Sequence, residues 1–196
     1  MNFHQSTLDA AHLIKNFVRE TPVEQSHWLS KETDAHVWFK CENLQHTGSF
    51  KFRGAVNKLL SLSDEERSSG VVSASTGNHG AAVARATFLL EIRCTIFVPE
   101  NASSAKLKAI EAYGAQIAKK GDDCLVAEAA GRLYASENEM SYVSPYNDPE
   151  IVAGQGTAGV ELIKQLPDVE ALFVSLGGGG LISGMAGAMK LSLIHI

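Results

Sequence analysis

The sequence predicts an α/β protein in which a parallel sheet is covered by helices on both faces. Short apolar stretches typical of strands alternate with longer segments that have helical spacing. The stretch at residues 171–176 is mostly apolar, as expected for a strand that is buried on both faces. Turns rich in small or polar residues connect expected strands to expected helices at residues 73–80 and 177–180.

The first part of the chain is mainly helical. We expect a helix at residues 8–18, a turn at 21–26, a short helix at 27–32 and a strand at 36–40. A longer helix follows, in which Phe52, Val56, Leu59 and Leu62 recur at helical spacing and define a buried face. Ser49 stands where the N-cap residue of this helix belongs.

The middle and the end of the chain repeat a strand-to-helix unit. Residues 70–90 predict a brief strand, a polar turn and an alanine-rich helix. Two further units are expected: a strand at 93–99 with a helix at 103–114, and a strand at 115–120 with a helix at 122–137. A helix at 148–166 follows, then a strand at 171–176 and a glycine turn that enters a helix, at 177–190. Gly114 is a typical helix C-terminal signal.

Composition and charge argue against several classes of function. The chain has 196 residues, of which 45% are hydrophobic and 20% charged, as in ordinary globular proteins. A net charge of -5 argues against nucleic acid as the main partner. No apolar run approaches the roughly 18 residues of a membrane helix, and the N-terminus does not resemble a signal peptide.

Cysteine and histidine spacing indicates the compartment and the metal content. Cys41, Cys94 and Cys124 form no CxxC pair, which fits reduced thiols and predicts a cytoplasmic protein. The seven histidines show no metal-ligand spacing. We therefore expect no metal ion in this chain.

Four consecutive glycines, Gly177 to Gly180, stand between an apolar stretch and a helix. Backbone N–H groups can converge on an anion at such a turn, and the helix N-terminus adds positive potential. A merely flexible turn is the less favoured interpretation. The run therefore predicts a phosphate site, although it is not a Walker A motif, because no Gly-Lys-Ser/Thr follows.

Residues 154–159, GQGTAG, match the GxGxxG pattern of NAD-binding proteins letter for letter. That pattern is informative only after a strand and at the opening of a helix. Asp148 and Pro149 instead predict an N-cap and a first helical residue, so the glycines fall inside a helix that has already begun. We interpret them as sites of close packing and keep an NAD-dependent dehydrogenase as a minority alternative.

Lys51 stands at the expected start of a helix, where a cation is locally unfavourable. We expect the helix N-terminus and the nearby Arg53 to lower the pKa of its amine, while Phe50 and Phe52 exclude water. Arg53 itself is assigned a structural or electrostatic role. Gly54 leaves room for a flat group to lie close. A solvated helix lysine is the alternative interpretation.

The turn at residues 73–80 offers hydroxyl, amide and imidazole groups from Ser75, Thr76, Asn78 and His79. Such groups suit a carboxylate or a phenolic oxygen, although an N-cap cluster with a loop histidine is an equal alternative. Together with Lys51 and the glycine run, this turn indicates a Schiff-base site for pyridoxal phosphate.

At this point the sequence resembles the fold type II pyridoxal phosphate enzymes, and most closely the threonine/serine dehydratase and serine racemase group. The resemblance is carried, in order and spacing, by "KCENLQHTGSFKFRGA", "SASTGNHG", "GQGT" and "SLGGGG". It covers nearly the whole chain and implies a two-lobed, tryptophan synthase β-like fold. Residues 1–66 and 145–196 would form the large cofactor-binding domain, and residues 67–144 the small, mobile domain.

The resemblance also implies a role for each site residue. Lys51 matches the Schiff-base lysine that removes the α-proton, Asn78 the residue facing the ring hydroxyl, and Gly177 to Gly180 with Leu181 the phosphate loop. The loop that grips the substrate carboxylate in relatives corresponds to Ser75, Thr76, Asn78 and His79. Racemases carry serine, the second acid/base, where this chain has Thr76, while many dehydratases have alanine, so racemisation stays open.

The implied activity is that of a pyridoxal phosphate-dependent ammonia-lyase, which converts L-threonine or L-serine into a 2-oxo acid and ammonia. A serine racemase-type isomerase and a non-catalytic fragment are the alternatives. Family analogy implies a homodimer or higher homo-oligomer. Members of this group are longer, and their later part supplies a ligand for the pyridine nitrogen, often a cation site, and part of the sheet. We therefore expect this chain to be C-terminally truncated and its last residues, "LSLIHI", to be an incidental tail.

Overall fold

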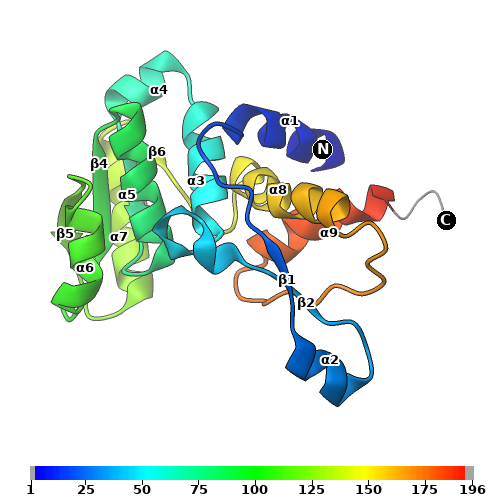
Figure 1. The fold of residues 1–196 in the computed structure, drawn as a ribbon. Helices are drawn as coiled ribbons and strands as arrows, with labels where there is room; N and C mark the ends of the chain where they lie inside the picture. Colours follow the sequence, from blue (N-terminus) through cyan, green and yellow to red (C-terminus); the bar gives the residue numbers. More distant parts are fainter. Residues whose placement is uncertain (1–2, 193–196) are drawn as a thin grey trace.

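A computed structural model describes residues 3–192 of the chain (Figure 1). The tail at residues 193–196 therefore lies outside the described residues. Four parallel strands form one sheet in the order β5–β4–β3–β6. These strands are β3 (Val71–Ala74), β4 (Cys94–Val98), β5 (Gln116–Lys119) and β6 (Ser141–Tyr142). The parallel sheet predicted from the sequence is confirmed, but β6 was not predicted, because two residues are too few for a recognisable pattern.

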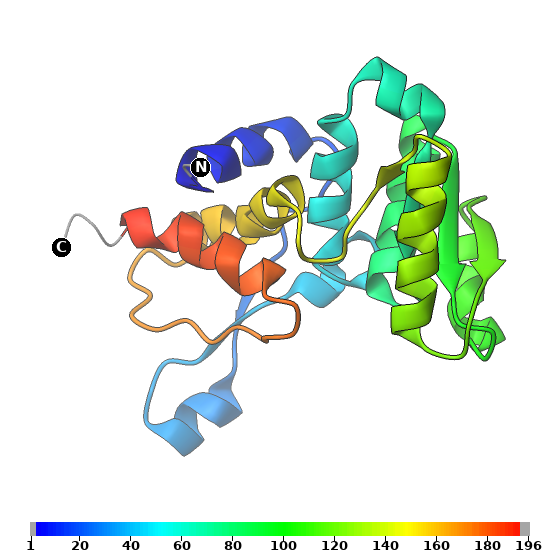
Figure 2. The ribbon, with the colours of Figure 1, turned by 180° about the vertical axis from the view of Figure 1, so that it is seen from behind.

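Helices cover both faces of this sheet, as expected. The helices α5 (Asn78–Leu90) and α6 (Ser104–Glu111) lie on one face, and α7 (Cys124–Glu137) lies on the other, which faces the viewer in Figure 2. Successive side chains of a strand point to opposite faces of the sheet. Val71 packs in the hydrophobic cluster on the α5 side, and Val72 in the cluster on the α7 side. Both clusters are buried, which explains why β3 and β4 are mainly apolar, with Ser73 and Thr95 as their hydroxyl-bearing residues.

A second group of helices packs around α8 (Pro149–Gln165), which contacts α1 (Phe3–Ile14), α3 (Lys51–Leu60) and α9 (Gly180–Ser192). The predicted start of α8 is confirmed, because the Asp148 carboxylate accepts hydrogen bonds from the backbone N–H groups of Glu150 and Ile151. The predicted buried face of α3 is also confirmed. Phe52, Val56 and Leu59 are completely buried there.

The glycines of the GQGTAG stretch lie inside α8 and allow its neighbours to approach closely. A Cβ atom on Gly154 would lie 2.7 Å from the Gly54 Cα atom in α3. A Cβ atom on Gly156 would lie 2.7 Å from the Gly184 carbonyl oxygen in α9. The packing interpretation is therefore confirmed, and the NAD alternative is wrong because these glycines do not open a helix after a strand.

An arm made of β1 (Val23–Gln25), α2 (His27–Thr33) and β2 (Trp38–Lys40) projects from the rest of the molecule (Figures 1 and 2). The two strands pair antiparallel, so the simple turn expected at residues 21–26 is wrong. None of the residues of α2 is buried, and Trp28 is 70% exposed. The arm thus carries aromatic surface that the described residues do not cover. A short helix, α4 (Asp64–Ser69), which was not predicted, leads from α3 to β3.

The strand expected at residues 171–176 does not form. These residues are irregular, and Phe173 is 97% exposed. A strand must hydrogen-bond its backbone N–H and C=O groups to a neighbouring strand. No strand within residues 3–192 pairs with this segment, so apolar composition alone does not produce a strand here.

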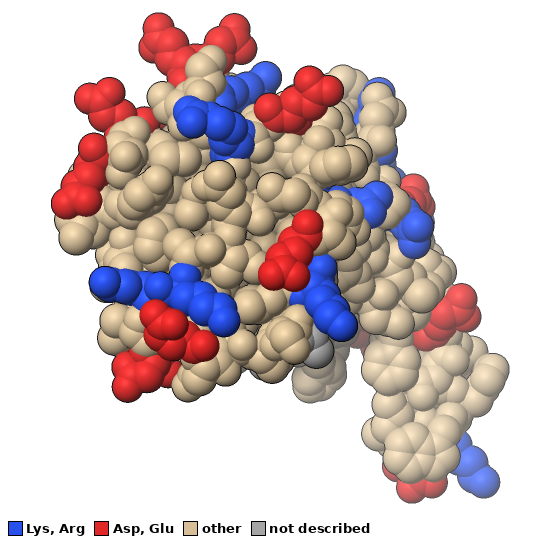
Figure 3. Space-filling model, turned by 90° about the vertical axis from the view of Figure 1, so that its left-hand side faces the viewer, with Lys and Arg blue, Asp and Glu red and all other residues tan. Residues whose placement is uncertain are grey.

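The described residues show no membrane-spanning helix or cluster of metal ligands, and no strongly charged face in the view of Figure 3. Acidic and basic side chains are interspersed over the face that Figure 3 shows. In the described part of the chain, no helix has the length and apolar character needed to cross a membrane. Residues 3–192 contain no group of three or more histidine, cysteine, aspartate or glutamate residues placed to hold a metal.

Candidate active site

The chain reaches Lys51 through two short 3-10 turns, η1 (Glu42–Leu44) and η2 (His46–Gly48). Thr47 has a φ angle of 62° and Gly48 one of 73°, both in the left-handed region. Glycine adopts this region freely, whereas threonine, which is β-branched, does so only under strain. Strain of this kind is concentrated at functional sites, because the surrounding structure must hold it in place.

Ser49 does not cap α3, contrary to our expectation. Its backbone is extended, with φ -164° and ψ 160°, and the cap position belongs to Phe50. The Ser49 hydroxyl is buried and has no hydrogen-bond partner in the described part of the chain, and the same is true of the Thr47 hydroxyl. Two buried hydroxyl groups thus stand unpaired immediately before Lys51.

Lys51 is the first residue of α3, and its amine is held by a main-chain carbonyl. The Nζ atom donates a hydrogen bond to the Pro145 carbonyl oxygen at 2.6 Å and lies 5.3 Å from the centroid of the Phe50 ring. Burial lowers the pKa of the Lys51 amine, because the charged form loses its water. The direction predicted from the sequence is confirmed, although its cause is different from the one we expected.

Arg53 does not contribute to this pKa shift, because its charge is already neutralised. Its guanidinium is fully buried and donates to both oxygens of Glu42, each at 2.8 Å. It also donates to both oxygens of Glu161, at 2.6 and 2.8 Å. The second carboxylate is shared with Lys40, whose Nζ atom lies 2.6 Å away. One of the two cations at the start of α3 is therefore structural.

Gly54 does not leave an open space beside Lys51. A Cβ atom on Gly54 would overlap the side-chain amide of Gln155 and lie 2.9 Å from the Ile151 carbonyl oxygen. The flat group that lies against Gly54 is thus an amide of α8 itself. Our expectation of room for a ligand at this position is wrong.

His79 is buried between the parallel sheet and Lys51. Its Nε2 atom lies 3.1 Å from the Val143 carbonyl oxygen, which also accepts a hydrogen bond from the Ser73 hydroxyl at 2.9 Å. A carbonyl only accepts, so Nε2 carries the proton and Nδ1 is a bare acceptor. Burial lowers the pKa of His79 to about 4, and the Lys51 charge acts in the same direction. This neutral ring is unsuited to the carboxylate contact that we expected.

The other polar residues of this turn lie at the C-terminal end of β3. Ser75 and Thr76 are half-buried, and the Ser75 hydroxyl accepts a hydrogen bond from the Gly77 N–H at 3.1 Å. Asn78 is the exposed first residue of α5. Within residues 3–192, no hydrogen bond joins these side chains to Lys51. The first-turn N–H groups of α5 have no acceptor inside the helix and can bind an anion.

The four glycines form an open turn at the start of α9. Gly179 has a φ angle of 85°, which only glycine adopts without strain. Cβ atoms on Gly177 and Gly179 would meet no atom of residues 3–192 within 4 Å, whereas one on Gly178 would overlap the Tyr146 ring. The backbone is therefore accessible on one side, and the N–H groups of the first turn of α9 are free to bind an anion.

In the folded chain, the Lys51 amine and the glycine turn contact two consecutive residues. Lys51 bonds to the carbonyl of Pro145, and Gly178 and Gly180 pack against Tyr146. Neither Pro145 nor Tyr146 was singled out from the sequence as a site residue. The only signal there is that both stand shortly before the predicted helix cap at Asp148. The two predicted anchors, far apart in the chain, thus share one short stretch of backbone.

These residues fit pyridoxal phosphate. An amine of lowered pKa suits condensation with an aldehyde, and an open glycine turn at a helix N-terminus suits a phosphate. Within the described part of the chain, Thr47 Oγ1, Ser49 Oγ and His79 Nδ1 are buried polar atoms without a hydrogen-bond partner. Buried polar groups are normally paired, so their unpaired state is consistent with a polar ligand.

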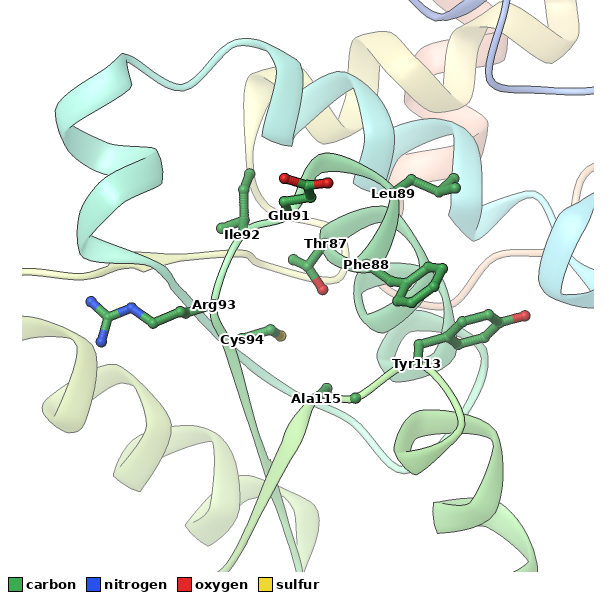
Figure 4. A pocket seen from close by; sticks show the side chains of 10 residues that line it. Thr87, Phe88, Leu89, Glu91, Ile92, Arg93, Cys94, Tyr113 and Ala115 are labelled. Atoms are coloured by element: carbon green, nitrogen blue, oxygen red, sulfur yellow. The ribbon is translucent and has the colours of Figure 1, made fainter.

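A cavity of about 570 Å³ lies elsewhere, at the far end of α5 (Figure 4). Phe88, Arg93 and Tyr113 are among the residues that line it. It opens near the N-terminal end of β4, whereas ligands of parallel α/β sheets bind at the carboxyl ends of the strands. This cavity is therefore separate from the Lys51 site.

Comparison with known proteins gives a consistent result. The model of the protein family described as "Pyridoxal-phosphate dependent enzyme" matches residues 14–196. The chain is 44% identical to an L-threo-3-hydroxyaspartate ammonia-lyase of Saccharomyces cerevisiae, over 93% of this chain and 56% of that protein. It is 46% identical to a catabolic L-threonine dehydratase of Staphylococcus aureus, over 90% of this chain and 51% of that protein.

Among solved structures, maize serine racemase superposes with a TM-score of 0.93 at 36% identity, covering 97% of this chain and 58% of that one. The α/β fold with a parallel sheet is thus shared with this structure. The chain spans about half the length of the curated relatives it matches.

Proposed function

Because this chain belongs to the pyridoxal-phosphate dependent enzyme family, we propose that its protein is an ammonia-lyase that converts small β-hydroxy amino acids into 2-oxo acids and ammonia. One observation carries the proposal: the Lys51 amine and the glycine turn meet at Pro145 and Tyr146. The relatives named threonine dehydratase and hydroxyaspartate ammonia-lyase support the same reaction class.

Each part of the cofactor has a proposed holder in this chain. Lys51 would hold the aldehyde carbon, Asn78 the ring hydroxyl, and Gly177 to Gly180 with Leu181 the phosphate. Bound pyridoxal phosphate supplies a conjugated ring that takes up the negative charge left at the α-carbon when a proton is removed.

The proton transfer is assigned to Lys51. Its Nζ atom, whose pKa is lowered by burial, would take the α-proton, and the Pro145 carbonyl would accept a hydrogen bond from the resulting ammonium. The substrate carboxylate would bind at the Ser75–Asn78 turn, to the hydroxyl groups of Ser75 and Thr76 and to the first-turn N–H groups of α5. The neutral His79 ring would not take part in that contact.

Racemisation is a second candidate, favoured by the likeness to maize serine racemase. The Thr76 hydroxyl would then serve as the second acid/base. Incubation with L-serine followed by chiral analysis separates the two reactions, because a lyase yields pyruvate and a racemase yields D-serine. If D-serine is the main product, the lyase proposal is wrong.

The covalent test uses borohydride, which fixes pyridoxal phosphate to the lysine that holds it. The purified protein is incubated with the cofactor, reduced and digested, and the labelled peptide is identified by mass spectrometry. We expect the label on Lys51 and its loss in a Lys51→Ala variant, together with the loss of 2-oxo acid formation from L-threonine. Lys108→Ala, at an exposed position of α6, is the control and should keep both.

A Lys51→Ala variant that still takes the label at the same stoichiometry and still turns over substrate would contradict the proposal. A protein that takes no label at any lysine would support the alternative of a non-catalytic fragment.

Three further features of the protein are proposed with this function. Residues 67–144 would move as a small domain against residues 1–66 and 145–196. The exposed aromatic arm around Trp28 supports a homo-oligomer, with a second copy covering it. The three free cysteines support a reducing compartment such as the cytoplasm.

A further inference from the structure

We propose that the dipeptide Pro145–Tyr146 is a positioning element for the cofactor: the Tyr146 ring supports the glycine turn, and the Pro145 carbonyl holds the Lys51 amine. The inference rests on the proposed function and deepens it. It assigns to an uncharged aromatic residue, outside the glycine turn, control over how well the phosphate is bound.

The glycine turn contacts Tyr146 at alternate residues. A Cβ atom on Gly178 would overlap the Tyr146 ring, and one on Gly180 would lie 3.2 Å from the Tyr146 Cα atom and from its carbonyl oxygen. Cβ atoms on Gly177 and Gly179 would meet none of the described residues within 4 Å. The turn therefore rests on Tyr146 with one side and leaves the other side open to a ligand.

Pro145–Tyr146 is itself fixed at both ends. On the side of β6, the Val143 N–H donates to the Val72 carbonyl at 2.8 Å, and the Val143 carbonyl accepts from Ser73 and His79. On the other side, the Asp148 carboxylate caps α8. Proline adds a restricted φ angle in between. The dipeptide is thus tied to β6 on one side and to the start of α8 on the other.

The Lys51 hydrogen bond ends on the same support. Its acceptor, the Pro145 carbonyl, is separated from the Tyr146 Cα atom by a single peptide unit. The planar peptide group thus links the position of the amine to the position of the glycine turn. A ligand that carries an aldehyde and a phosphate must reach the amine and the glycine turn at the same time. The linkage therefore sets the distance between aldehyde and phosphate that a ligand must have to fit.

The test compares two ligands that differ only in the phosphate, namely pyridoxal phosphate and pyridoxal. For each, the concentration that half-saturates borohydride labelling of Lys51 is measured by mass spectrometry. In the wild-type protein we expect a lower value for pyridoxal phosphate, because only this ligand uses the glycine turn. Tyr146→Ala should reduce that advantage about tenfold or more, a change of roughly 1.4 kcal/mol in binding. Tyr146→Phe, which keeps the ring, should retain it.

Labelling by pyridoxal itself should change little in Tyr146→Ala, which separates a specific effect from general unfolding. Gly178→Ala should also lose the phosphate advantage, because its Cβ atom would meet the ring. In the double variant Gly178→Ala/Tyr146→Ala the ring is gone, so the advantage should be partly restored relative to Gly178→Ala alone.

Two outcomes would overturn the inference while leaving the proposed function intact: a full phosphate advantage in Tyr146→Ala, or purely additive effects in the double variant. If neither ligand labels Lys51 in the wild-type protein, the proposed function fails, and the inference fails with it.

Discussion

Lys51 and Pro145, 94 residues apart in the chain, are joined by a 2.6 Å hydrogen bond from the amine to the carbonyl. Within residues 3–192 the amine forms no ion pair, and burial is the only cause of its lowered pKa. A carbonyl orients an amine without holding its proton as a carboxylate would. The contact therefore positions Lys51 and leaves it able to lose a proton.

The first prediction concerns the pH dependence of Lys51 labelling. Only the uncharged amine attacks an aldehyde, so a lowered pKa moves the midpoint of labelling below the ordinary value of 10.5. We expect Lys51 to be labelled by pyridoxal phosphate at a lower pH than an exposed lysine such as Lys108. Quantitative mass spectrometry of peptides labelled over a pH series measures both midpoints. Equal midpoints would show that burial does not activate Lys51.

The second prediction concerns the buried Arg53 network. Arg53→Met would leave the half-buried carboxylates of Glu42 and Glu161 without their fully buried partner, which costs about 3–5 kcal/mol of unfolding free energy. Arg132→Met is the matched control, because it breaks an exposed pair with Glu128. That change should cost roughly 0–1 kcal/mol. Urea unfolding followed by circular dichroism measures both, and equal losses would contradict the structural role of Arg53.

Local signals in the sequence were sufficient to predict much of this site. Lys51 at a helix start and the glycine run before a helix are recognisable within a few residues, and both lie where expected. The structural role of Arg53 is confirmed, but its effect on the Lys51 pKa was predicted wrongly, because the partners that neutralise its charge lie 11 and 108 residues away. Pro145 and Tyr146 were missed for the same reason, since only the folded chain brings them to Lys51 and to the glycines.

The strand expected at residues 171–176 shows a different limit of sequence reasoning. Helices such as α8 satisfy their backbone groups internally, so a cap and a periodic apolar face are enough to predict them. A strand needs a second segment of chain at its side. The pattern of residues 171–176 says nothing about whether that segment is present, and in the described residues it is not.

The third prediction concerns the close contact between α8 and α9. A Cβ atom on Gly184 would lie 2.6 Å from the Gly156 backbone nitrogen, and backbone cannot move aside cheaply. We expect Gly184→Ala to lower the unfolding free energy by about 1–3 kcal/mol or more. Gly131→Ala in α7 is the control, since its Cβ atom would lie 3.3 Å from the Phe97 side chain, which can adjust. The control should be neutral, or stabilising by up to about 1 kcal/mol.

Urea unfolding of the two glycine variants decides the third prediction. Gly184→Ala as stable as the wild-type protein would show that α8 and α9 do not need this close approach.

The fourth prediction concerns the pH dependence of stability that His79 produces. Its pKa is lowered to about 4 in the folded protein, whereas an unfolded histidine titrates near 6.5. Between these values the unfolded chain binds a proton that the folded chain does not, so folding stability falls as pH decreases through this window. The loss should reach about 2 kcal/mol by pH 5.

Comparison with His79→Gln isolates this contribution, because glutamine can donate a hydrogen bond to the Val143 carbonyl but cannot be protonated in this range. Unfolding free energies at pH 7 and pH 5 are measured by urea titration for both proteins. We expect the wild-type protein to lose about 2 kcal/mol more than the variant between these pH values, since the other titrating groups are common to both. Identical losses would mean that the buried imidazole accepts a proton without cost. His79 would then be free to act as an acid beside Lys51, and the neutral form inferred from its bond to Val143 would be wrong.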